Sequence, residues 1–431
     1  MFEKIFQLKA NKTTLKTEII AGVTTFMTMA YILAVNPDIL SNTGMDKSAV
    51  FTATALSALV ATLFMAFVAK LPFALAPGMG LNAFFAFTVV ITMGYPWQFA
   101  LTAVFLEGII FLLLTAFNIR ELIINSIPLN MKHSVSAGIG LFIAFIGLQN
   151  AGIVVNNDAT LVSLGNMGSA SVLLALGGVL LTGVLLVMKV KGALLIGIIV
   201  TTIAGIPFHV THLPHDNSLV SLPPSLEPIF FKLDFSNIFS LDMLIVLFTF
   251  LFVDLFDTVG TLVGVSDKAG MLDKQGRVPR VKQALFADSI GTTLGAIFGT
   301  STVTTYVESA AGVAEGGKTG MTAFTTAILF GLALFFAPLF TMIPSAATAP
   351  ALILVGLFML SPVKKIDLED FTEAIPAFFT IVMMPLTYSI AEGIVFGMMS
   401  YVLLKTITGK FKDVSILMYI LTVLFFIKFI I

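Results

Sequence analysis

ALAPGMGLNAFFAF (residues 74–87) and GTSTVTTYVESAAGV (residues 299–313) are the two stretches that decide the fold of this chain. Both stand where a membrane-spanning helix is expected, and both contain residues that interrupt a helix. The first carries Pro77, Gly78 and Gly80, and the second carries a run of hydroxyl and β-branched side chains. Backbone N–H and C=O groups freed at membrane depth are tolerated only where protein or a water-filled cavity satisfies them. The two stretches therefore predict a buried site between broken membrane segments.

The composition of the whole chain agrees with a membrane protein. Of its 431 residues, 58% are hydrophobic and 11% are charged, and the mean hydropathy is +1.03. Soluble globular chains are about 45–50% apolar and about 25% charged, because their surface faces water. The net charge of −1 gives no sign of nucleic-acid binding. The absence of cysteine excludes disulfides, thiolate metal sites and a cysteine nucleophile.

Apolar runs between charges and Pro or Gly breaks predict fourteen membrane spans, since roughly 20 apolar residues cross a bilayer as a helix. Loops on the cytoplasmic side are enriched in Lys and Arg. With the N-terminus inside, 20 of the 23 basic residues fall on that side, and the exceptions are Lys47, Lys232 and Lys428. The C-terminal apolar segment 414–431 is long enough to cross or to lie at the interface. The predicted spans are 18–36, 50–69, 77–90, 98–117, 133–149, 171–188, 192–207, 242–263, 284–298, 305–316, 319–340, 345–361, 371–386 and 388–404.

Seven spans on each side of the polar segment 208–241 predict two repeats inserted in opposite orientations. HSVSAGIGLFIAFIGL (133–148) and SAATAPALILVGLFML (345–360) support this, because each begins with small residues before an apolar run. Interrupted segments in matching positions of two such halves mark the substrate site of secondary transporters. The sequence predicts an all-α polytopic membrane protein with a 7+7 inverted repeat, broken in its third and tenth spans.

Carboxylates at membrane depth are the candidate functional residues. Glu107, Asp254, Asp257, Glu308 and Glu392 all lie inside predicted spans. A charged side chain at the bilayer centre costs at least about 2.5–3.5 kcal/mol on insertion scales. Each acid must therefore be protonated, bind a cation or hydrogen-bond a polar ligand. For Glu107 and Glu392 we favour bracing of neighbouring helices, because few other polar residues surround them in the sequence.

Asp257 and Glu308 form the strongest pair among these acids. In FVDLFDTVGTL (252–262), Asp257 and Thr261 are four residues apart and share a helix face, with Asp254 at its edge. Glu308 follows the hydroxyl run at the start of a predicted half-helix, where free N–H groups favour an acceptor. Two such carboxylates can divide the work, one holding the donor groups of a ligand while the other titrates. Capping or bracing of a neighbouring helix is the alternative for Asp254 or Asp257.

Two motifs match chemical patterns that the context does not support. GVAEGGKT (312–319) fits the phosphate-binding pattern G-x-x-x-x-G-K-[ST], which is meaningful between a buried strand and a helix of a soluble domain. HVTHLPH (209–215) spaces three histidines by three, but a proline interrupts it in a predicted outside loop. We expect neither nucleotide binding nor a metal site. No H-E-x-x-H or G-x-S-x-G pattern occurs, and an enzyme is not expected.

Five segments together resemble the nucleobase:cation symporter-2 family, and within it the adenine/guanine/hypoxanthine (AzgA-like) permease branch. The resemblance covers nearly the whole chain. Its segments are GVTTFMTMAYILAVNP (22–37), APGMGLNAFFAF (76–87), FVDLFDTVGTLVGV (252–265), ADSIGTTLGAIFGTSTVTTYVESAAGVAEGGKTG (287–320) and MPLTYSIAEGI (384–394).

The resemblance implies a core domain and a gate domain, each built from both halves. The core would comprise residues 18–117 (spans 1–4) and 242–340 (spans 8–11). The gate would comprise residues 133–207 (spans 5–7) and 345–404 (spans 12–14). Spans 3 and 10 would each contain a short strand beside the substrate. The implied activity is proton symport of a purine nucleobase into a cell, across a bacterial-type inner membrane with the N-terminus in the cytoplasm.

The resemblance also implies the residues of the substrate site. The two substrate carboxylates of the family fall on Asp257 and Glu308. Residues at the third-span break would face the purine, and two residues beside Glu308 would join them. These further residues are Asn82, Ala83, Phe84, Thr305 and Val307.

Three positions depart from the uracil-type relatives. Asp257 stands where those relatives carry Glu, Thr261 stands where they carry His, and Val307 stands where they carry Gly. A shorter acid and a lost imidazole fit a larger bicyclic base. Glu308, Asp257 and Asp254 are the candidates for the coupling proton.

Several points stay open at this level. No cofactor is implied besides the coupling proton, and sodium is the alternative coupling ion. A homodimer is one alternative for the assembly, because dimers occur in the family. The alternative functions are an ion or proton channel, or a sulfate- or bicarbonate-type anion carrier of similar architecture. Anions would favour Arg or Lys at the half-helix ends.

Overall fold

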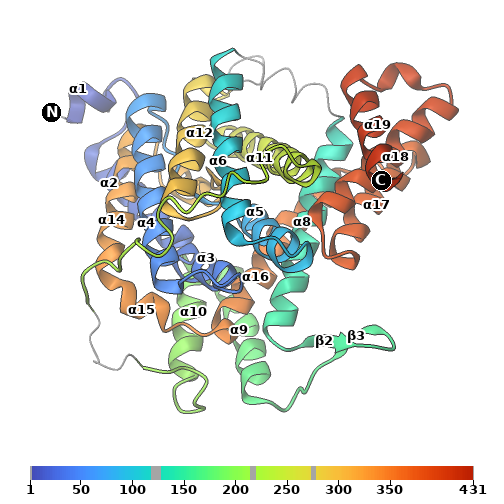
Figure 1. The fold of residues 1–431 in the computed structure, drawn as a ribbon. Coiled ribbons are helices and arrows are strands. Elements are labelled where there is room, and N and C mark those ends of the chain that lie inside the picture. The colour runs from blue at the N-terminus through green and yellow to red at the C-terminus, as the bar shows by residue number, and fades with distance from the viewer. Residues whose placement is uncertain (1, 118–127, 214–219, 273–277, 431) are drawn as a thin grey trace. The chain divides into compact units, whose positions relative to one another are not determined.

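The computed structural model describes residues 2–117, 128–213, 220–272 and 278–430, and these are mainly helical (Figure 1). Within the described residues, eight helical stretches are long and apolar enough to cross a membrane. They are Leu15–Ser41, Lys47–Ala69, Trp97–Ala116, Leu129–Asn150, Ala170–Val187, Gly320–Thr341, Ser345–Lys365 and Ile390–Ile407. Shorter apolar helices cover Met79–Thr92, Ala193–Ala204 and Phe371–Leu386. The chain is a multi-pass membrane protein.

Each predicted span of the first half overlaps a helix or a strand followed by a helix. The β2–β3 hairpin was not predicted from the sequence. The elements are α1 (Phe2–Phe6), α2 (Leu15–Met29), α3 (Ile32–Ser41), α4 (Lys47–Phe64), the π-helix η1 (Met65–Ala69), β1 (Leu75–Pro77), α5 (Met79–Ala83), the π-helix η2 (Phe84–Thr92), α6 (Trp97–Ala116), α8 (Leu129–Asn150), β2 (Val154–Asn157), β3 (Leu161–Leu164), α9 (Ala170–Val187) and α10 (Ala193–Ala204).

The second half shows the same agreement between predicted spans and observed elements. Its elements are α11 (Leu241–Lys268), α12 (Val281–Phe298), β4 (Val303–Thr305), α13 (Ser309–Ala314), α14 (Gly320–Ala333), the 3-10 helix η3 (Leu334–Phe336), α15 (Ala337–Thr341), α16 (Ser345–Leu360), the 3-10 helix η4 (Ser361–Lys365), α17 (Phe371–Leu386), α18 (Ile390–Ile407), the 3-10 helix η5 (Phe411–Asp413) and α19 (Ile416–Ile430).

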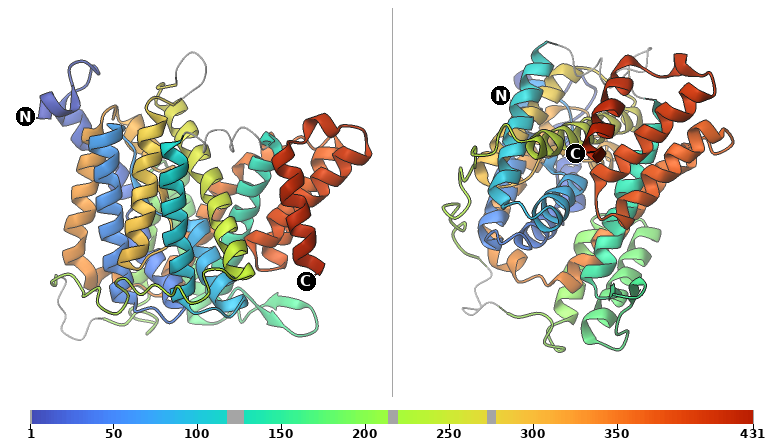
Figure 2. Two further views of the ribbon diagram at one scale, coloured as in Figure 1. Left: turned by 45° about the horizontal axis from the view of Figure 1, so that its top comes forward. Right: turned by 45° about the vertical axis from the view of Figure 1, so that its right-hand side comes forward.

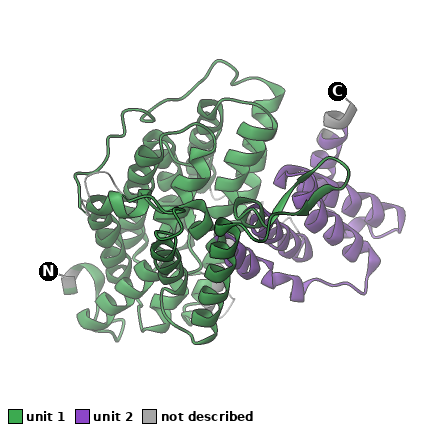
Figure 3. Ribbon diagram, turned by 90° about the horizontal axis from the view of Figure 1, so that it is seen from below, with its two compact units in different colours: residues 1–117, 147–351 green, residues 118–146, 352–431 purple. Residues whose placement is uncertain are grey.

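The chain forms two compact units (Figure 3). Unit 1 comprises residues 1–117 and 147–351, and unit 2 comprises residues 118–146 and 352–431. In unit 1, helices α14, α4, α12 and α6 lie side by side in that order (Figure 2). The division into a core and a gate domain concerns motion between conformations and stays a prediction.

Strands β1 and β4 lie inside unit 1, where β1 contacts α4 and α12 and β4 contacts α11 and α12. Leu75 of β1 and Val303 of β4 belong to a buried apolar cluster, which joins the two strands to the helices around them. The turn that leads into β4 depends on Gly299, whose φ of +99° lies in the left-handed region. A Cβ at Gly299 would also lie 2.6 Å from a carbon of Ile229. Glycine therefore allows α12 to end and the chain to reverse into the hydroxyl run.

Unit 2 is held together by close helix packing and a charge network. A Cβ at Gly397 of α18 would lie 1.8 Å from the Thr380 hydroxyl oxygen of α17, so only glycine permits this approach. The ammonium of Lys405 is buried and lies 2.7 Å from the Glu373 carboxylate. Nearby, the Lys410 ammonium lies 2.6 Å from Asp370 and helps to hold the pKa of that carboxyl below its usual range.

Candidate functional site

The two broken stretches meet as a pair of antiparallel strands. The N–H of Tyr306 donates to the carbonyl of Ala74 at 3.0 Å, and the N–H of Gly78 donates to the carbonyl of Thr302 at 2.9 Å. The pairing therefore satisfies backbone groups that would be costly to leave unpaired in a membrane. The register joins Leu75 to Thr305, Ala76 to Thr304 and Pro77 to Val303. The prediction of short broken or strand segments in spans 3 and 10 is confirmed.

A short helix follows each strand. Helix α5 and the π-helix η2 continue from β1, and α13 continues from β4. A π-helix widens the turn and is frequent at functional sites. The pair of strands thus lies between two helical segments that come from opposite halves of the sequence.

Glu308 lies between β4 and α13 and is half-buried. The phenol of Tyr31 donates to its Oε1 atom at 2.8 Å. The hydroxyl of Thr28 lies 3.5 Å from the Glu308 carbonyl oxygen. Both contacts come from the first predicted span, which therefore holds the side chain of Glu308 through Tyr31 and lies near its backbone through Thr28.

Asp257 lies on α11 beside the end of β1. A Cβ built on Gly78 would be 3.7 Å from Asp257 Oδ2 and 2.6 Å from Thr304 Cγ2. The Asp257 side chain is half-buried, and none of the described residues donates a hydrogen bond to it. It is close enough to Glu308 for their charges to interact. The structure therefore brings together the two carboxylates that the sequence singled out.

Asp254 has different surroundings from Asp257, although it is only three residues away. Its Oδ1 atom lies 2.8 Å from the hydroxyl of Thr258, which also lies 3.1 Å from Asp288 Oδ1. The same hydroxyl is 2.7 Å from that of Thr304 on β4. Asp254, Thr258, Asp288 and Thr304 are all buried. We call these four residues the Thr258 cluster.

The predicted residues of the third-span break are buried in α5 and at the start of η2. Asn82 Oδ1 accepts a hydrogen bond from Ser301, and Asn82 Nδ2 has no hydrogen-bond partner among the described residues. Ala83 is the last residue of α5. The ring of Phe84 packs edge-on against Phe250, with 4.8 Å between centroids.

The other predicted residues differ in their exposure. Thr305 is buried, and its hydroxyl oxygen has no hydrogen-bond partner among the described residues. Val307 is 48% exposed, and Thr261 is half-buried on α11. The roles assigned to these side chains in substrate binding stay predictions.

Several contacts at the site were not predicted from the sequence, although Glu107 itself was expected to brace neighbouring structure. Tyr31 bonds to Glu308, while Thr258 and Asp288 complete the cluster around Asp254. Glu107 Oε2 accepts from the hydroxyl of Thr302 at 2.5 Å, directly before β4. The spacing of four between Asp254 and Thr258 could have indicated one contact. The contacts of Tyr31, Asp288 and Glu107 cross between distant segments, and local spacing carries no sign of them.

The stretch that matches the phosphate-binding pattern surrounds a carboxylate of the chain itself. Glu18 of α2 is fully buried and accepts hydrogen bonds from the backbone N–H groups of Lys318, Thr319 and Thr322, at 3.0 to 3.3 Å. The hydroxyls of Thr319 and Thr322 donate to the same carboxylate at 2.9 and 2.6 Å. The N-terminus of α14 thus holds an acid from the first span, and that acid accepts the N–H groups that helix N-termini offer to anions.

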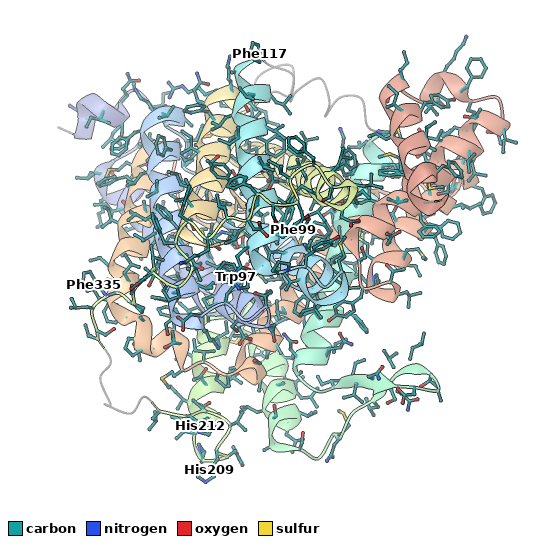
Figure 4. The ribbon with its side chains drawn as sticks, in the orientation of Figure 1. Trp97, Phe99, Phe117, His209, His212 and Phe335 are labelled. Atoms are coloured by element: carbon teal, nitrogen blue, oxygen red, sulfur yellow. The ribbon has the colours of Figure 1, made fainter. Side chains whose placement is uncertain are left out.

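The histidine motif lies far from these contacts along the chain. His209 and His212 stand on the loop that follows α10 (Figure 4), and the third histidine, at position 215, lies outside the described residues. No cluster of three or more potential metal ligands occurs among the residues that the structure describes.

The fold is that of a class of membrane transporters. The chain matches the transmembrane domain of a cyanobacterium bicarbonate transporter, BicA, with a TM-score of 0.66 and 16% sequence identity. The match covers 89% of this chain and 97% of that one. This likeness shows the predicted 7+7 inverted-repeat fold, and it shows nothing about the substrate.

The sequence identifies the family within that class. Residues 16–396 match the model described as Permease family, Xan_ur_permease, and the chain belongs to this family. It is 47% identical over 428 residues to the adenine permease AdeP of Escherichia coli, covering 99% of this chain and 96% of the relative. It is 48% identical over 436 residues to the guanine/hypoxanthine permease PbuG of Bacillus subtilis, covering 99% and 98%. The chain is therefore a permease rather than an enzyme.

Proposed function

We propose that this chain is a secondary active transporter that imports purine nucleobases by proton symport. The observation that carries the proposal is the pair of carboxylates, Asp257 and Glu308, beside the β1–β4 crossing. The names of the relatives point the same way, because AdeP is an adenine permease and PbuG is a guanine/hypoxanthine permease.

The chemistry of the two carboxylates suits a purine. Purines present ring N–H groups, and adenine and guanine also present an exocyclic amino group, so a neutral base offers several donors to acceptor oxygens. Tyr31 donates to Oε1 of Glu308, and among the described residues the carboxylate has one further donor, the backbone N–H of Glu308 itself. Neither Asp257 nor Glu308 forms an ion pair with any described residue. An anion carrier would instead place positive charge near this position.

The Thr258 cluster is a candidate site for the coupling proton, and it extends the earlier assignment of Asp254. A threonine hydroxyl has one proton to donate and two lone pairs that accept. The Thr258 hydroxyl lies near both Asp254 and Asp288 but can donate to only one of them. A proton on the other carboxyl would let that acid donate to Thr258. We propose that this cluster carries one proton, with Asp257 and Glu308 as the substrate acceptors. Sodium at the same cluster is the alternative.

The transport cycle is proposed to be alternating access, with the predicted core moving relative to the predicted gate. Broken segments in two inverted halves favour this mechanism over a static channel. The placement of basic residues in the sequence supports a cytoplasmic N-terminus in a bacterial-type inner membrane. A homodimer is the assembly we propose to test.

Counterflow in proteoliposomes tests the proposal. Vesicles preloaded with unlabelled hypoxanthine, guanine or adenine should take up the same labelled base faster than empty vesicles, because a carrier exchanges substrate across the membrane. An inward proton gradient should then drive accumulation, and an inward sodium gradient alone should not. Competition by adenine, guanine, hypoxanthine, xanthine and uracil at several pH values would rank the bases. Uptake without acceleration by preloading would contradict a carrier, and the lack of any purine uptake would contradict the substrate class.

A further inference from the structure

We propose that Tyr31 is a positioning residue that fixes the Glu308 carboxylate for substrate binding. This inference rests on the proposed purine transport and deepens it. Tyr31 stands where the first span is interrupted, between α2 and α3, and its side chain is 1% exposed. The hydroxyl of Tyr31 donates to Oε1 of Glu308, which lies directly before α13.

The position of Tyr31 relative to Glu308 is fixed by the packing around it. Helix α2 lies against α13 so closely that a Cβ on Gly312 would be 2.1 Å from the Thr25 hydroxyl oxygen and 2.5 Å from the Ala21 carbonyl oxygen. In the first turn of α2, Glu18 accepts hydrogen bonds from the N–H groups of Lys318 and Thr322, which fastens the start of α2 to the start of α14. The second helix of the span is fastened separately, because Asp38 of α3 accepts from the hydroxyl of Thr348 at 2.8 Å. Tyr31 therefore lies between two helices that are each held by hydrogen bonds, α2 through Glu18 and α3 through Asp38.

Among the described residues, Tyr31 is the one side chain that donates to the Glu308 carboxylate, whose other donor is the backbone N–H of Glu308 itself. With Oε1 occupied by the phenol, Oε2 is the carboxylate oxygen that we expect to accept from a donor of the ligand. Without the phenol, the glutamate side chain could rotate about its flexible torsions, and the ligand would have to order it on binding. Asp257 has a shorter side chain and no such donor among the described residues. The two acids therefore differ in how far the protein orients them before substrate arrives.

Tyr31→Phe removes one hydroxyl and keeps the ring that fills the space. We expect the dissociation constant for the purine, measured with radiolabelled base on purified protein, to rise about tenfold, since hydrogen bonds to charged groups are among the stronger ones. The KM for uptake should rise by a similar factor, while the maximal counterflow rate stays within about twofold, because the bond acts on binding.

Tyr95→Phe is a matched control, because it removes another phenol-to-carboxylate bond, the one from Tyr95 to Asp242 at the start of α11. We expect it to leave the dissociation constant unchanged. A double-mutant cycle with Glu308→Gln then tests whether Tyr31 acts through Glu308. Tyr31→Phe should have a much smaller effect on binding in the Glu308→Gln background than in the wild type.

Three results would overturn the inference. Tyr31→Phe could bind purine as tightly as the wild type, it could lower only the maximal rate, or its effect could persist in full in the Glu308→Gln background. Failure of the underlying function would look different, because wild-type protein would then bind no purine at all. The elution profile of the purified variants on size exclusion distinguishes a loss of binding from a loss of folding.

Discussion

The two broken segments pair with each other, but they contribute different things to the site. Apart from Asn82, the first segment, around β1, consists of small and apolar residues. The second, around β4, supplies Thr302, Thr304 and Glu308, and with them most of the polar contacts. Tyr306 of the second segment even donates its hydroxyl to the carbonyl of Pro77 in the first. An inverted repeat can therefore keep one backbone arrangement while the chemistry of its two copies diverges.

This difference follows from what each sequence permits. Gly78 has no side chain, which lets Thr304 and Asp257 approach the first segment closely. The hydroxyls of the second segment can bond to carboxylates on other helices, because each offers both a donor and an acceptor. The first segment thus contributes mainly the room left by the missing side chain of Gly78. The second contributes the hydroxyl groups and the carboxylate that form hydrogen bonds.

The largest effect is expected for Glu308→Gln. The substitution keeps the size of the side chain but replaces an acceptor-only carboxylate by an amide, so a purine donor and the phenol of Tyr31 compete for a single oxygen. We expect proton-driven purine uptake in proteoliposomes to fall at least about a hundredfold. Glu227→Gln in an exposed loop is the control for loss of a charge. Normal accumulation by Glu308→Gln would refute the role of the second segment.

The next effect is expected for Thr258→Val, which removes the hydroxyl shared by Asp254, Asp288 and Thr304 at nearly constant volume. Proton-driven accumulation should fall about tenfold, because the two carboxyls lose the group that joins them. Counterflow, which needs no net proton movement, should be retained to a much larger extent. Thr258→Ser, which restores a hydroxyl, should recover accumulation. Equal losses of counterflow and accumulation would show that the cluster is structural.

Gly78→Ala tests the first segment by filling its open space. The new Cβ would lie 2.6 Å from Thr304 Cγ2, so the strands or the threonine must move by several tenths of an ångström. Overpacking of this kind typically costs about 1–3 kcal/mol. We expect a lower thermal midpoint in detergent and an uptake rate reduced about fivefold.

Gly177→Ala on α9 provides the matched control for Gly78→Ala, since a Cβ there meets nothing within 4 Å. Alanine is also the better helix former, so this variant should be at least as stable as the wild type. If both glycine variants behave alike, close approach at Gly78 has no special importance.

The sequence was sufficient for much of the fold because the membrane restricts the alternatives. Long apolar stretches separated by charges predict spans, and freed backbone groups at Pro77 and Gly78 required a partner. The pairing of Ala76 with Thr304 could not be derived in the same way, because it joins residues far apart in the chain. The hairpin of β2 and β3 was missed because its alternation is short and its residues are largely exposed.

The candidate site was predictable in part for the same reasons. Acids at membrane depth are rare because a charge there costs free energy, which marked five acids as candidates, and the neighbouring polar residues then selected Asp257 and Glu308. Tyr31 could not, because a tyrosine in an apolar span costs little and its partner is fixed only by folding. Glu18 was missed for another reason, since it lies near the start of a span, where acids are common. Its partners are backbone N–H groups, which no side-chain pattern reveals.

The smallest effect is expected for Glu315→Gln, an acid at the opposite end of α13 from Glu308. Glu315 Oε1 forms an ion pair with Lys191 at 2.5 Å, but the two side chains are 28% and 54% exposed. Exposed ion pairs contribute little, because water screens them and both side chains must be ordered. We expect uptake within about twofold of the wild type and no change in the purine competition profile. A loss as large as that of Glu308→Gln would mean that an acid need not lie beside the β1–β4 pair to be required for uptake, and it would contradict the role given to the second segment.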